Sequence, residues 1–503
     1  MNRLKPPTID ELLAIYAEGP DAMCSLVQDL YASLNSQLDR LASLDSLQDQ
    51  LASLTAEVQQ LTARLAKDSH NSNKPPSTDV FKKPPKPPNL RGKSGKKSGG
   101  QPGHAGCTLE PVAKPDHFAV HAPETCASCG LSLDGAEVID RDIHQVFDIP
   151  EPRLEVTAHQ VLTCVCPQCK SLNRGQFPEF ASQPTQYGPR FLGLLVYLHQ
   201  YQLIPMARTQ ECFGDLFGHK PSEGTIATAV AKCAKQLTPV EKTIKGAIVK
   251  SEVVNFDETG MRVVKLLKWI HTASTASLTF YHSHSKRGRQ AFTEAGILKE
   301  FRGTAVHDCL VSYIDNSLVC KHGLCNVHLL RELIAIWEDS HQTWTQRMSS
   351  LLRSLKRAKE KAQAAGQSEL DAKLLQRYRR DYDRIVTRGL LKNPAPERTG
   401  KRGHPANGKV RSLLLRFEKH AEAVLRFATD FAVPFDNNLA ERDLRMVKLR
   451  QKISGCFRSD NGAEDFCTIR GYISTLRKQC INVMDGLNSV FEGTPVQPSF
   501  EPA

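Results

Sequence analysis

The sequence has no hydrophobic run long enough to cross a membrane. Its longest apolar stretch, residues 192–198, is far shorter than the roughly 20 residues that a spanning helix needs. The first thirty residues contain five acidic side chains and no apolar segment typical of a secretory signal. We therefore expect a cytoplasmic protein without a membrane partner, whose fifteen cysteines are reduced thiols or metal ligands.

Acidic residues are missing from residues 81–109, although the chain as a whole is only moderately basic, with a formal net charge of +12. Residues 68–110 are rich in Pro, Gly, Ser and Lys, a composition that cannot bury a core and predicts a disordered arm. Such an arm suits contacts with DNA phosphates, with an affinity that falls as salt rises. A solvated linker is the alternative. The basic side chains of this expected DNA-binding arm are Lys82, Lys83, Lys86, Arg91, Lys93, Lys96 and Lys97.

Leucine recurs at helical spacing before the arm. From Leu47 to Leu65, apolar residues follow one another at gaps of 4, 3, 4, 3 and 4 residues, the rhythm of a coiled coil. Residues 21–67 are therefore predicted to form a coiled-coil helix that joins chains into a homodimer or higher oligomer. The alternative is a helix that packs on its own domain. A chain of 503 residues is too long for one core, so further domains are expected.

Two Cys-x2-Cys pairs lie within residues 111–180. Cys126, Cys129, Cys166 and Cys169 offer four thiolates, the ligand set of a closed structural zinc site. Residues 144–164 alternate apolar and polar side chains, which predicts strands and a zinc-ribbon-like module. A site with four protein ligands performs no chemistry, so we expect structural Zn²⁺ here. Cys164 is a competing ligand next to the second pair.

Residues 187–240 are predicted to form three short helices. The first two are expected at about 189–203 and 206–217, and Ser222 is the expected N-cap of the third. This layout is compatible with a helix-turn-helix DNA-binding unit. A packing role is the alternative, and the pattern favours neither.

The pattern becomes that of a β-sheet from residue 250. An apolar strand expected to end at Asp257, two meander strands, a helix and a fourth strand that ends at Asp308 give the order of an RNase H-like core. In such a core the first and fourth strands lie adjacent and parallel, so the two aspartates are expected to face each other. Clustered carboxylates hold the paired divalent ions of phosphodiester chemistry. Residues 250–480 are therefore predicted to be a catalytic domain with two Mg²⁺ or Mn²⁺ ions.

A third carboxylate is expected from a helix that packs against this sheet. Residues 434–437 are typical of a helix start, which puts Glu441 in the second turn. Arg445 and Lys448 follow at i+4 and i+7 on the same face, where they suit the phosphates of bound DNA. A surface ion pair with Arg445 is the alternative role of Glu441, and the two upstream aspartates favour the catalytic one.

In combination, these segments resemble the transposases of insertion sequence family 66, which are DDE-type enzymes. The resemblance covers nearly the whole chain and is carried in order by NSNKPPS, GGQPGHAG, the paired Cys-x2-Cys, FDETG, HDCLVSY, CNVHLLREL and PFDNNLAERDLRMVKLRQKISG. It implies Mg²⁺-dependent cleavage at the ends of a mobile element and strand transfer into target DNA, with Asp257, Asp308 and Glu441 as the triad. It gives supporting or DNA-contacting roles to Asn438, Arg445 and Lys448. It also implies accessory proteins encoded by the element and a bacterial, nucleoid-associated location.

One segment departs from a minimal core, because 132 residues separate Asp308 from Glu441. Residues of about 343–429 are typical of long basic helices, which predicts an all-helical insertion that contacts DNA or mediates dimerisation. A solvated helical hairpin is the alternative. Residues 481–503 are expected to be a C-terminal tail.

Cys320, His322, Cys325 and His328 have metal-like spacing, for which a second zinc is one hypothesis. Cys325 and His328 also resemble the Cys-x2-His motif that follows the second aspartate in related transposases, which makes His328 a support of the active site. A buried core role of the cysteines is the third hypothesis.

The predicted protein is thus a multidomain α/β chain with a coiled coil, a basic arm, a zinc-ribbon-like module, a helical DNA-binding unit and an RNase H-like catalytic domain with an all-helical insertion. Two other functions stay open, a DNA-binding protein without catalysis and a metal-dependent nuclease that cuts without joining. All three carboxylates are present, which weighs against the first. Terminal inverted repeats around the gene would favour a transposase over both.

Overall fold

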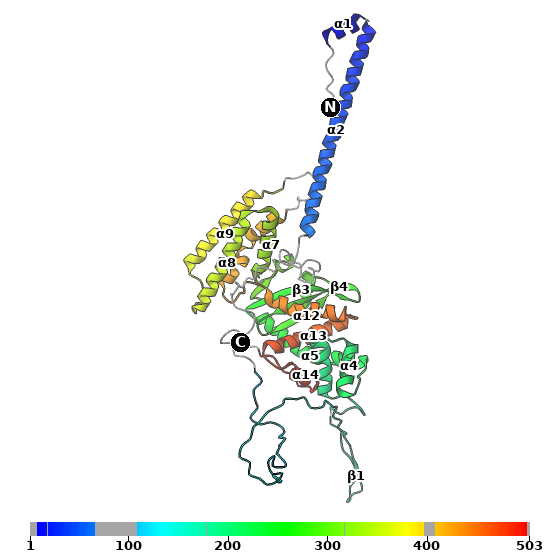
Figure 1. The fold of residues 1–503 in the computed structure, drawn as a ribbon, viewed down its shortest axis with the longest axis vertical. Helices are drawn as coiled ribbons and strands as arrows, with labels where there is room; N and C mark the ends of the chain where they lie inside the picture. The colour runs from blue at the N-terminus through cyan, green and yellow to red at the C-terminus, as the bar shows by residue number, and fades with distance from the viewer. Residues whose placement is uncertain are drawn as a thin grey trace. The chain divides into compact units, whose positions relative to one another are not determined.

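The computed structural model describes residues 8–17, 19–65, 108–178, 180–315, 317–396 and 408–499 (Figure 1). The chain divides into two compact units: Met1–Pro87 with Leu330–Gln346, and Pro88–Leu329 with Arg347–Ala503. The arm residues Lys82, Lys83, Lys86, Arg91, Lys93, Lys96 and Lys97 lie outside the described residues.

The first unit contains helices α1 (Ile9–Ala17) and α2 (Pro20–Leu65). At α1, the Thr8 N–H donates to Glu11 Oε2 (2.7 Å) and the Glu11 N–H donates to Thr8 Oγ1, a reciprocal cap. The predicted long helix is confirmed, since α2 has 46 residues and therefore a length of about 69 Å. Its pairing with a second chain stays a prediction.

A five-stranded sheet forms the centre of the second unit. Its strands are β3 (Val253–Val263), β4 (Leu266–Ser274), β5 (Thr279–His284), β6 (Thr304–His307) and β7 (Lys321–Leu324), in the order β5-β4-β3-β6-β7. The expected antiparallel meander and the intervening helix α6 (Arg289–Ala295) are confirmed, as is the parallel pairing of the first and fourth strands. The expectation that the first strand ends at Asp257 is wrong, because β3 continues for six more residues paired with β4.

Helices cover both faces of this sheet. On one face, Val254 and Phe256 of β3 share an apolar core with α5 (Glu223–Lys250) and α13 (Asp460–Lys478). On the other face, Met261 and Val263 pack with α12 (Asn438–Ser454), which lies along β3 in Figure 1. Because side chains alternate between faces along a strand, the odd-numbered residues of β3 point toward α12.

Buried polar contacts lock α12 and α13 onto the meander. Asp443 of α12 accepts hydrogen bonds from Ser274 Oγ (2.7 Å) and Lys478 Nζ (2.8 Å), and its carbonyl accepts from the Tyr281 hydroxyl (2.9 Å). A buried charge needs such partners, since an unpaired one would cost several kcal/mol. These contacts fix the position of the helix that carries Glu441.

The predicted helical unit is built into the same core. It consists of α3 (Pro189–Val196), the π-helical turn η2 (Tyr197–Tyr201), α4 (Met206–Phe217) and α5. The expected cap is confirmed, because Ser222 Oγ accepts from the Thr225 N–H at 3.0 Å. The third helix is longer than expected, with 28 residues, because its apolar face continues along the sheet.

The C-terminal segment is not a simple tail. Residues from Val483 to Phe491 form helix α14, whose Leu487 and Val490 are fully buried. A Cβ on Gly193 of α3 would meet the Asn488 side chain of α14 at 2.2 Å, so the two helices approach closely at this glycine. The apolar side chains of α14 belong to the main core, which explains the difference from the expectation.

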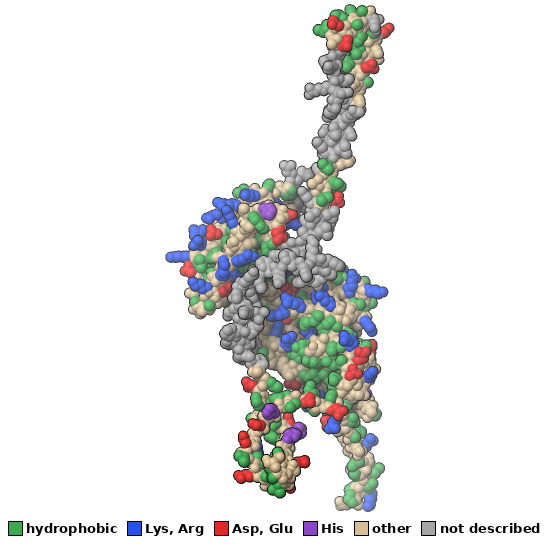
Figure 2. Space-filling view, viewed as in Figure 1, with side chains coloured by type: hydrophobic (Ala, Val, Ile, Leu, Met, Phe, Trp, Pro, Cys, Tyr) green, Lys and Arg blue, Asp and Glu red, His purple; other side chains and the backbone are tan. Residues whose placement is uncertain are grey.

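The described residues of the expected insertion form helices joined by short non-helical segments. The helices are α8 (Thr343–Ala364), α9 (Ala372–Lys392), α10 (Lys409–Lys419) and α11 (Ala421–Thr429), and α7 (Asn326–Ser340) precedes them. Figure 2 shows Lys and Arg side chains gathered over α8 and α9. Lys359 of α8 is an exception, because it is buried and donates to the carbonyls of Phe431 and Val433 at 2.9 and 2.8 Å. The insertion therefore holds the loop that leads into α12.

Residues 108–178 lack a core, and none of them is buried. Only β1 (Thr163–Val165) and β2 (Leu172–Arg174) form strands here, so the expectation of strands throughout residues 144–164 is wrong. Pro150 and Pro152 cannot donate ladder hydrogen bonds, and no packed surface covers the apolar side chains between them and β1. Every helix in the described part of the chain is too short or too polar to span a bilayer.

Candidate active site

Asp257 and Asp308 lie at the same level of the sheet. The parallel register pairs Asn255 of β3 with Val306 of β6. Two residues further along both chains, Asp257 is therefore level with Asp308, which directly follows the end of β6. Asp257 is on the α12 side of β3. Its Oδ1 accepts from the Glu258 N–H at 2.9 Å, and Asp308 Oδ1 accepts from the Leu310 N–H at 3.1 Å.

Glu441 reaches this position from the first turn of α12, rather than from the second turn as expected. The difference arises because the helix begins at Asn438. The preceding residue, Asn437, is buried and ties the helix start to β3. Its Oδ1 accepts from Asn255 Nδ2 and its Nδ2 donates to the Phe256 carbonyl, both at 2.8 Å.

The carboxylates are close enough to perturb one another. Burial, followed by the negative charges of Glu258 and Asp308 and then of Glu441, raises the pKa of Asp257 well above its usual value. Within the described residues, Asp257, Asp308 and Glu441 form no ion pair with a lysine or arginine. The unneutralised cluster is an environment that favours a bound cation.

Glu258 points to the opposite face of β3 and has its own partners. Arg287 donates to Glu258 Oε1 from Nε (2.9 Å) and Nη2 (2.8 Å), and the Tyr313 hydroxyl donates to Oε2 at 2.7 Å. Burial and the charge of Asp308 raise the pKa of Glu258. Because Tyr313 follows Asp308 by five residues, this contact fastens the segment after Asp308 to β3.

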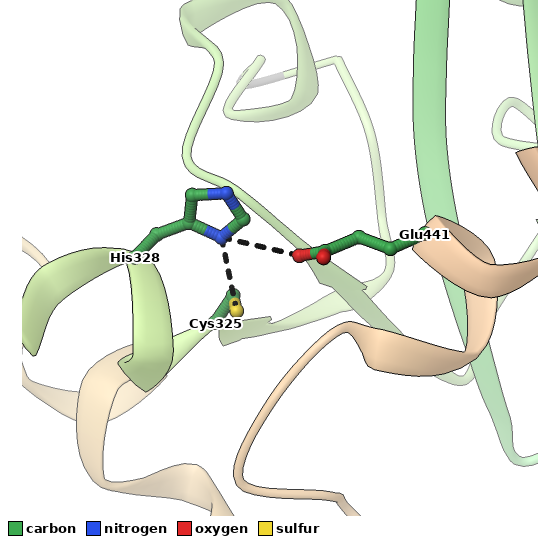
Figure 3. Close-up of side chains that lie close together, drawn as sticks. All are labelled: Cys325, His328 and Glu441. Atoms are coloured by element: carbon green, nitrogen blue, oxygen red, sulfur yellow. Dashed lines mark hydrogen bonds and ion pairs between the residues drawn. The ribbon is translucent and has the colours of Figure 1, made fainter. Parts of the chain in front are cut away.

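The structure brings Cys325 and His328 to Glu441 (Figure 3). His328 Nδ1 lies 3.1 Å from Cys325 Sγ and 3.7 Å from Glu441 Oε1. His328, which was expected to support the active site, thus lies beside Glu441, and its supporting role stays a prediction. His322 lies elsewhere, with its Nδ1 3.1 Å from His307 Nε2, and Cys320 is buried in the main core.

The expected DNA-contacting residues of α12 differ in their surroundings. Arg445 and Asn438 are exposed. Lys448 is half-buried, and its Nζ donates to the Gly260 carbonyl of β3 at 2.5 Å. Because an ammonium group has three N–H donors, this hydrogen bond leaves Lys448 able to contact a phosphate as well.

The two Cys-x2-Cys pairs adopt the same turn. In each pair the N–H of the first cysteine donates to the carbonyl five residues later, at 2.8 Å, in Leu131 and in Ser171. The fourth residue after it, Gly130 or Lys170, has a positive φ and donates back to the first cysteine. A short β pairing closes both turns, Thr125 with Ser132 and Val165 with Leu172.

One thiol in each turn has a lowered pKa. Backbone N–H groups of Ser128 and Cys129 lower the pKa of Cys126, and the Ser171 hydroxyl, 2.9 Å from Cys169 Sγ, lowers the pKa of Cys169 to about 7. Although all four cysteines are described, no three of their sulfurs lie within 4.8 Å of one another. Each pair is thus preformed, and the two pairs are not joined into one ligand set.

Comparison with known proteins gives three matches. A family described as Transposase IS66 family matches residues 184–465, more than half of the chain. The chain belongs to the IS66 family of transposases. It is a DNA transposase of an insertion sequence, and DNA is its partner. No curated protein sequence matches the chain.

The other two matches cover the N-terminal part of this IS66 transposase. The zinc-finger binding domain of transposase IS66 matches residues 123–170, which include both cysteine turns. The resemblance seen in the sequence and the presence of a structural zinc module are thereby confirmed. A family of unknown function (DUF6444) matches residues 23–110.

Two groups of residues around the site escaped prediction from the transposase sequence. The sequence marked Asn437 only as part of a helix start, whereas its side chain makes no capping hydrogen bond and instead contacts β3. Glu258 with Arg287 and Tyr313 had no local signal. Its partners come from segments 29 and 55 residues away in the chain.

Proposed function

We propose that this transposase cuts and joins DNA with Asp257, Asp308 and Glu441 as the metal-binding triad of an RNase H-like core. The observation that supports this most strongly is the convergence of the three carboxylates. Glu441 lies 133 residues after Asp308 in the sequence, yet α12 brings its negative charge close enough to act on Asp257. The strand order β5-β4-β3-β6-β7, with β3 and β6 parallel, supports the same assignment.

The residues present fit a divalent cation. Carboxylate oxygens are the ligands that Mg²⁺ and Mn²⁺ prefer. Among the described residues, Glu441 Oε1 is buried without a hydrogen-bond partner. Burial, together with the charges of neighbouring carboxylates that include Asp308 and Glu441, raises the pKa of Asp257. Divalent cations bound there would activate the attacking oxygen and stabilise the leaving oxygen of the phosphodiester.

The chain's own residues keep these ligands in place before DNA arrives. Asn437 fixes the start of α12 on β3, and the Glu258–Tyr313 hydrogen bond fixes the segment after Asp308. Arg287 neutralises Glu258, so that this buried carboxylate is held in a salt bridge and is not one of the proposed metal ligands. Preorganised ligands of this kind spare the site the cost of rearrangement during the reaction.

DNA is expected to contact several basic regions. The arm residues, the exposed Arg445 of α12 and the basic faces of α8 and α9 suit phosphates, which predicts binding that weakens steeply as salt rises. Cys126, Cys129, Cys166 and Cys169 are the proposed ligands of the structural Zn²⁺. We expect the terminal repeats of the element as the specific partner, with accessory proteins of the element in a nucleoid-associated complex.

Helix α2 is proposed to join two copies of the chain. Its residues Leu30, Leu34, Leu51 and Leu54 are each more than half exposed. A 46-residue helix with such a stripe buries it best against an identical helix. Cleavage of the two ends of one element also requires two active sites to act together.

The experiment that tests this function is cleavage of a plasmid that carries the gene's own flanking DNA, with Mg²⁺ or Mn²⁺ added. We expect nicks with 3′-OH ends at the element boundaries, followed by joining to target DNA. Asp257→Asn should reduce cleavage by about 1,000-fold or more. Asp381→Asn, at an exposed carboxylate of α9, is the matched control and should cleave normally.

Each other outcome overturns part of the proposal. A protein that binds the ends but never cuts them, even with the accessory proteins, is a DNA-binding protein. A protein that cuts without joining is a nuclease. Equal cleavage by wild type and Asp257→Asn would remove Asp257 from the triad.

A further inference from the structure

Cys325, His328 and Glu441 form a cluster of mixed chemistry at the edge of the carboxylate site (Figure 3). Cys325 follows β7, His328 lies in the first turn of α7, and Glu441 lies in the first turn of α12. One sulfur, one nitrogen and one oxygen atom of these residues all lie within 4.8 Å of one another. Mg²⁺ sites formed by carboxylates do not require the Cys325 sulfur or the His328 nitrogen as ligands.

The separations match those of a tetrahedral metal site. With metal–ligand bonds of about 2.3 Å to sulfur and about 2.0–2.1 Å to nitrogen and oxygen, tetrahedral angles imply about 3.5 Å between S and N and about 3.3 Å between N and O. The observed values are 3.1 Å from Cys325 Sγ to His328 Nδ1 and 3.7 Å from His328 Nδ1 to Glu441 Oε1. Each differs from the ideal value by only a few tenths of an ångström.

A second, independent observation comes from the hydrogen bonds. Glu441 Oε1 is buried and has no hydrogen-bond partner, which is costly for a carboxylate oxygen. Cys325 is 1% exposed, and its sulfur accepts from the Asn437 N–H at 3.2 Å. Burial raises the pKa of the Cys325 thiol to about 12, and the backbone N–H donors of His328 and Asn437 oppose that rise. A bound metal ion would stabilise the thiolate further.

We propose that Cys325, His328 and Glu441 bind a thiophilic divalent cation of the Zn²⁺ class, at a site separate from the zinc module. Three protein ligands leave a fourth position for water or for an oxygen of DNA. The set selects Zn²⁺ over Mg²⁺, because Mg²⁺ binds thiolate and imidazole poorly. The ligand set differs from the one that sequence spacing indicates, since Glu441 replaces Cys320 and His322.

A consequence follows for DNA cleavage, and it rests on the proposed function. Glu441 belongs to both the triad and this cluster, so a thiophilic cation that engages Oε1 withdraws that oxygen from the ions held by the aspartates. We therefore expect Zn²⁺ to inhibit cleavage that Mg²⁺ supports. The cluster would therefore act as an inhibitory metal site for DNA cleavage.

Zinc content of the full-length chain tests the site directly. Protein equilibrated with Zn²⁺ and separated from loosely bound ions should hold one equivalent more in wild type than in Cys325→Ser or His328→Ala, as counted by elemental analysis. Cys320→Ser changes a buried cysteine that directly precedes β7, whereas Cys325 directly follows it. This variant is the matched control and should hold the wild-type amount of zinc. Circular dichroism identifies any variant that has not folded, and Glu441→Gln then replaces it in the comparison.

Equal zinc content in wild type, Cys325→Ser and His328→Ala would overturn the site. For the consequence, the concentration of Zn²⁺ that halves Mg²⁺-supported cleavage should rise about 10-fold or more in Cys325→Ser. Equal sensitivity would refute the sharing of Glu441. The zinc count does not depend on Asp257, so failure of this proposal is distinct from failure of the catalytic triad.

Discussion

The proposed catalytic site and the zinc module of this transposase are stabilised in opposite ways. The carboxylates lie on a sheet between two apolar layers, and buried hydrogen bonds from Asn437 and Asp443 hold the helix that carries Glu441. The zinc module, by contrast, has no buried residue in 108–178. Each of its two cysteine turns is closed by local hydrogen bonds, and the sulfurs of the two turns do not form one ligand set. The fold thus holds the proposed catalytic residues in place by packing, whereas no core holds the two cysteine turns of the zinc module together.

Removal of zinc is the largest expected effect and the most direct way to break this comparison. Zinc binding to such modules contributes about 10–16 kcal/mol, so its loss should unfold residues 108–178. Cys166→Ser, or a chelator, should raise amide hydrogen exchange there to the rate of an unstructured chain. Amides of β3 and α5 should exchange as slowly as before. Protection of the module without zinc, or opening of the sheet, would contradict the contrast.

Asn437→Ala should produce the second largest effect, a loss of stability around the proposed catalytic site. It removes two hydrogen bonds and leaves Asn255 Nδ2 and the Phe256 carbonyl buried without partners, at a cost of about 2–3 kcal/mol. Hydrogen exchange of β3 and α12 measures this loss. Asn438→Ala is the matched control at the exposed neighbour and should cost less than about 0.5 kcal/mol. Equal effects of the two changes would mean that the helix start is not a preorganising element.

The pH dependence of stability sharpens the comparison further. Because folding raises the pKa of Asp257, the folded chain keeps its proton to higher pH than the unfolded chain does. Without added Mg²⁺, this group therefore lowers stability as pH rises from about 3.9 through the raised folded value. Asp257→Asn should stabilise the zinc-loaded, Mg²⁺-free protein at pH 7 by about 1 kcal/mol, measured by hydrogen exchange of β3.

Addition of Mg²⁺ should reverse that order. Wild type gains about 2.7 kcal/mol when the ion is at 100 times its dissociation constant, and the variant gains much less. A variant that is less stable than wild type under both conditions would show that the carboxylate is stabilised by the fold itself.

The smallest expected effect concerns the two cysteine turns. Gly130 and Lys170 occupy equivalent positions with φ of 74° and 60°, a conformation that costs an ordinary residue roughly 1 kcal/mol. Lys170→Gly should therefore strengthen zinc binding about fivefold, and Gly130→Lys should weaken it to a similar degree. A Cβ at Gly130 meets nothing within 4 Å, so the backbone alone accounts for the change. Competition with a chromogenic chelator measures both affinities, and unchanged affinities would mean that the turns are not strained.

The sequence by itself determined the local elements of this transposase. Apolar periodicity and caps identified the long helix α2, the meander strands, the start of α5 at Ser222 and the helical insertion, because these depend on neighbours a few residues apart. The cysteine pairs likewise identified the zinc module, since each turn is closed within eight residues. The assignment of Asp257, Asp308 and Glu441 to a triad was also made from the sequence, and it stays a proposal.

Only the tertiary structure decided where distant segments meet. The partners of Glu258, the contact of Asn437 with β3, the burial of α14 and the meeting of Cys325 and His328 with Glu441 join residues that no local pattern connects. Such contacts depend on strand order and on which face of β3 each helix covers, and these follow from packing of the whole core. For the same reason β3 runs past Asp257 and the alternating residues 144–162 form no strand. Whether a segment forms a strand depends on a neighbouring strand to pair with and on a packed layer to cover it. β3 has both and residues 144–162 have neither, and the local sequence does not show this difference.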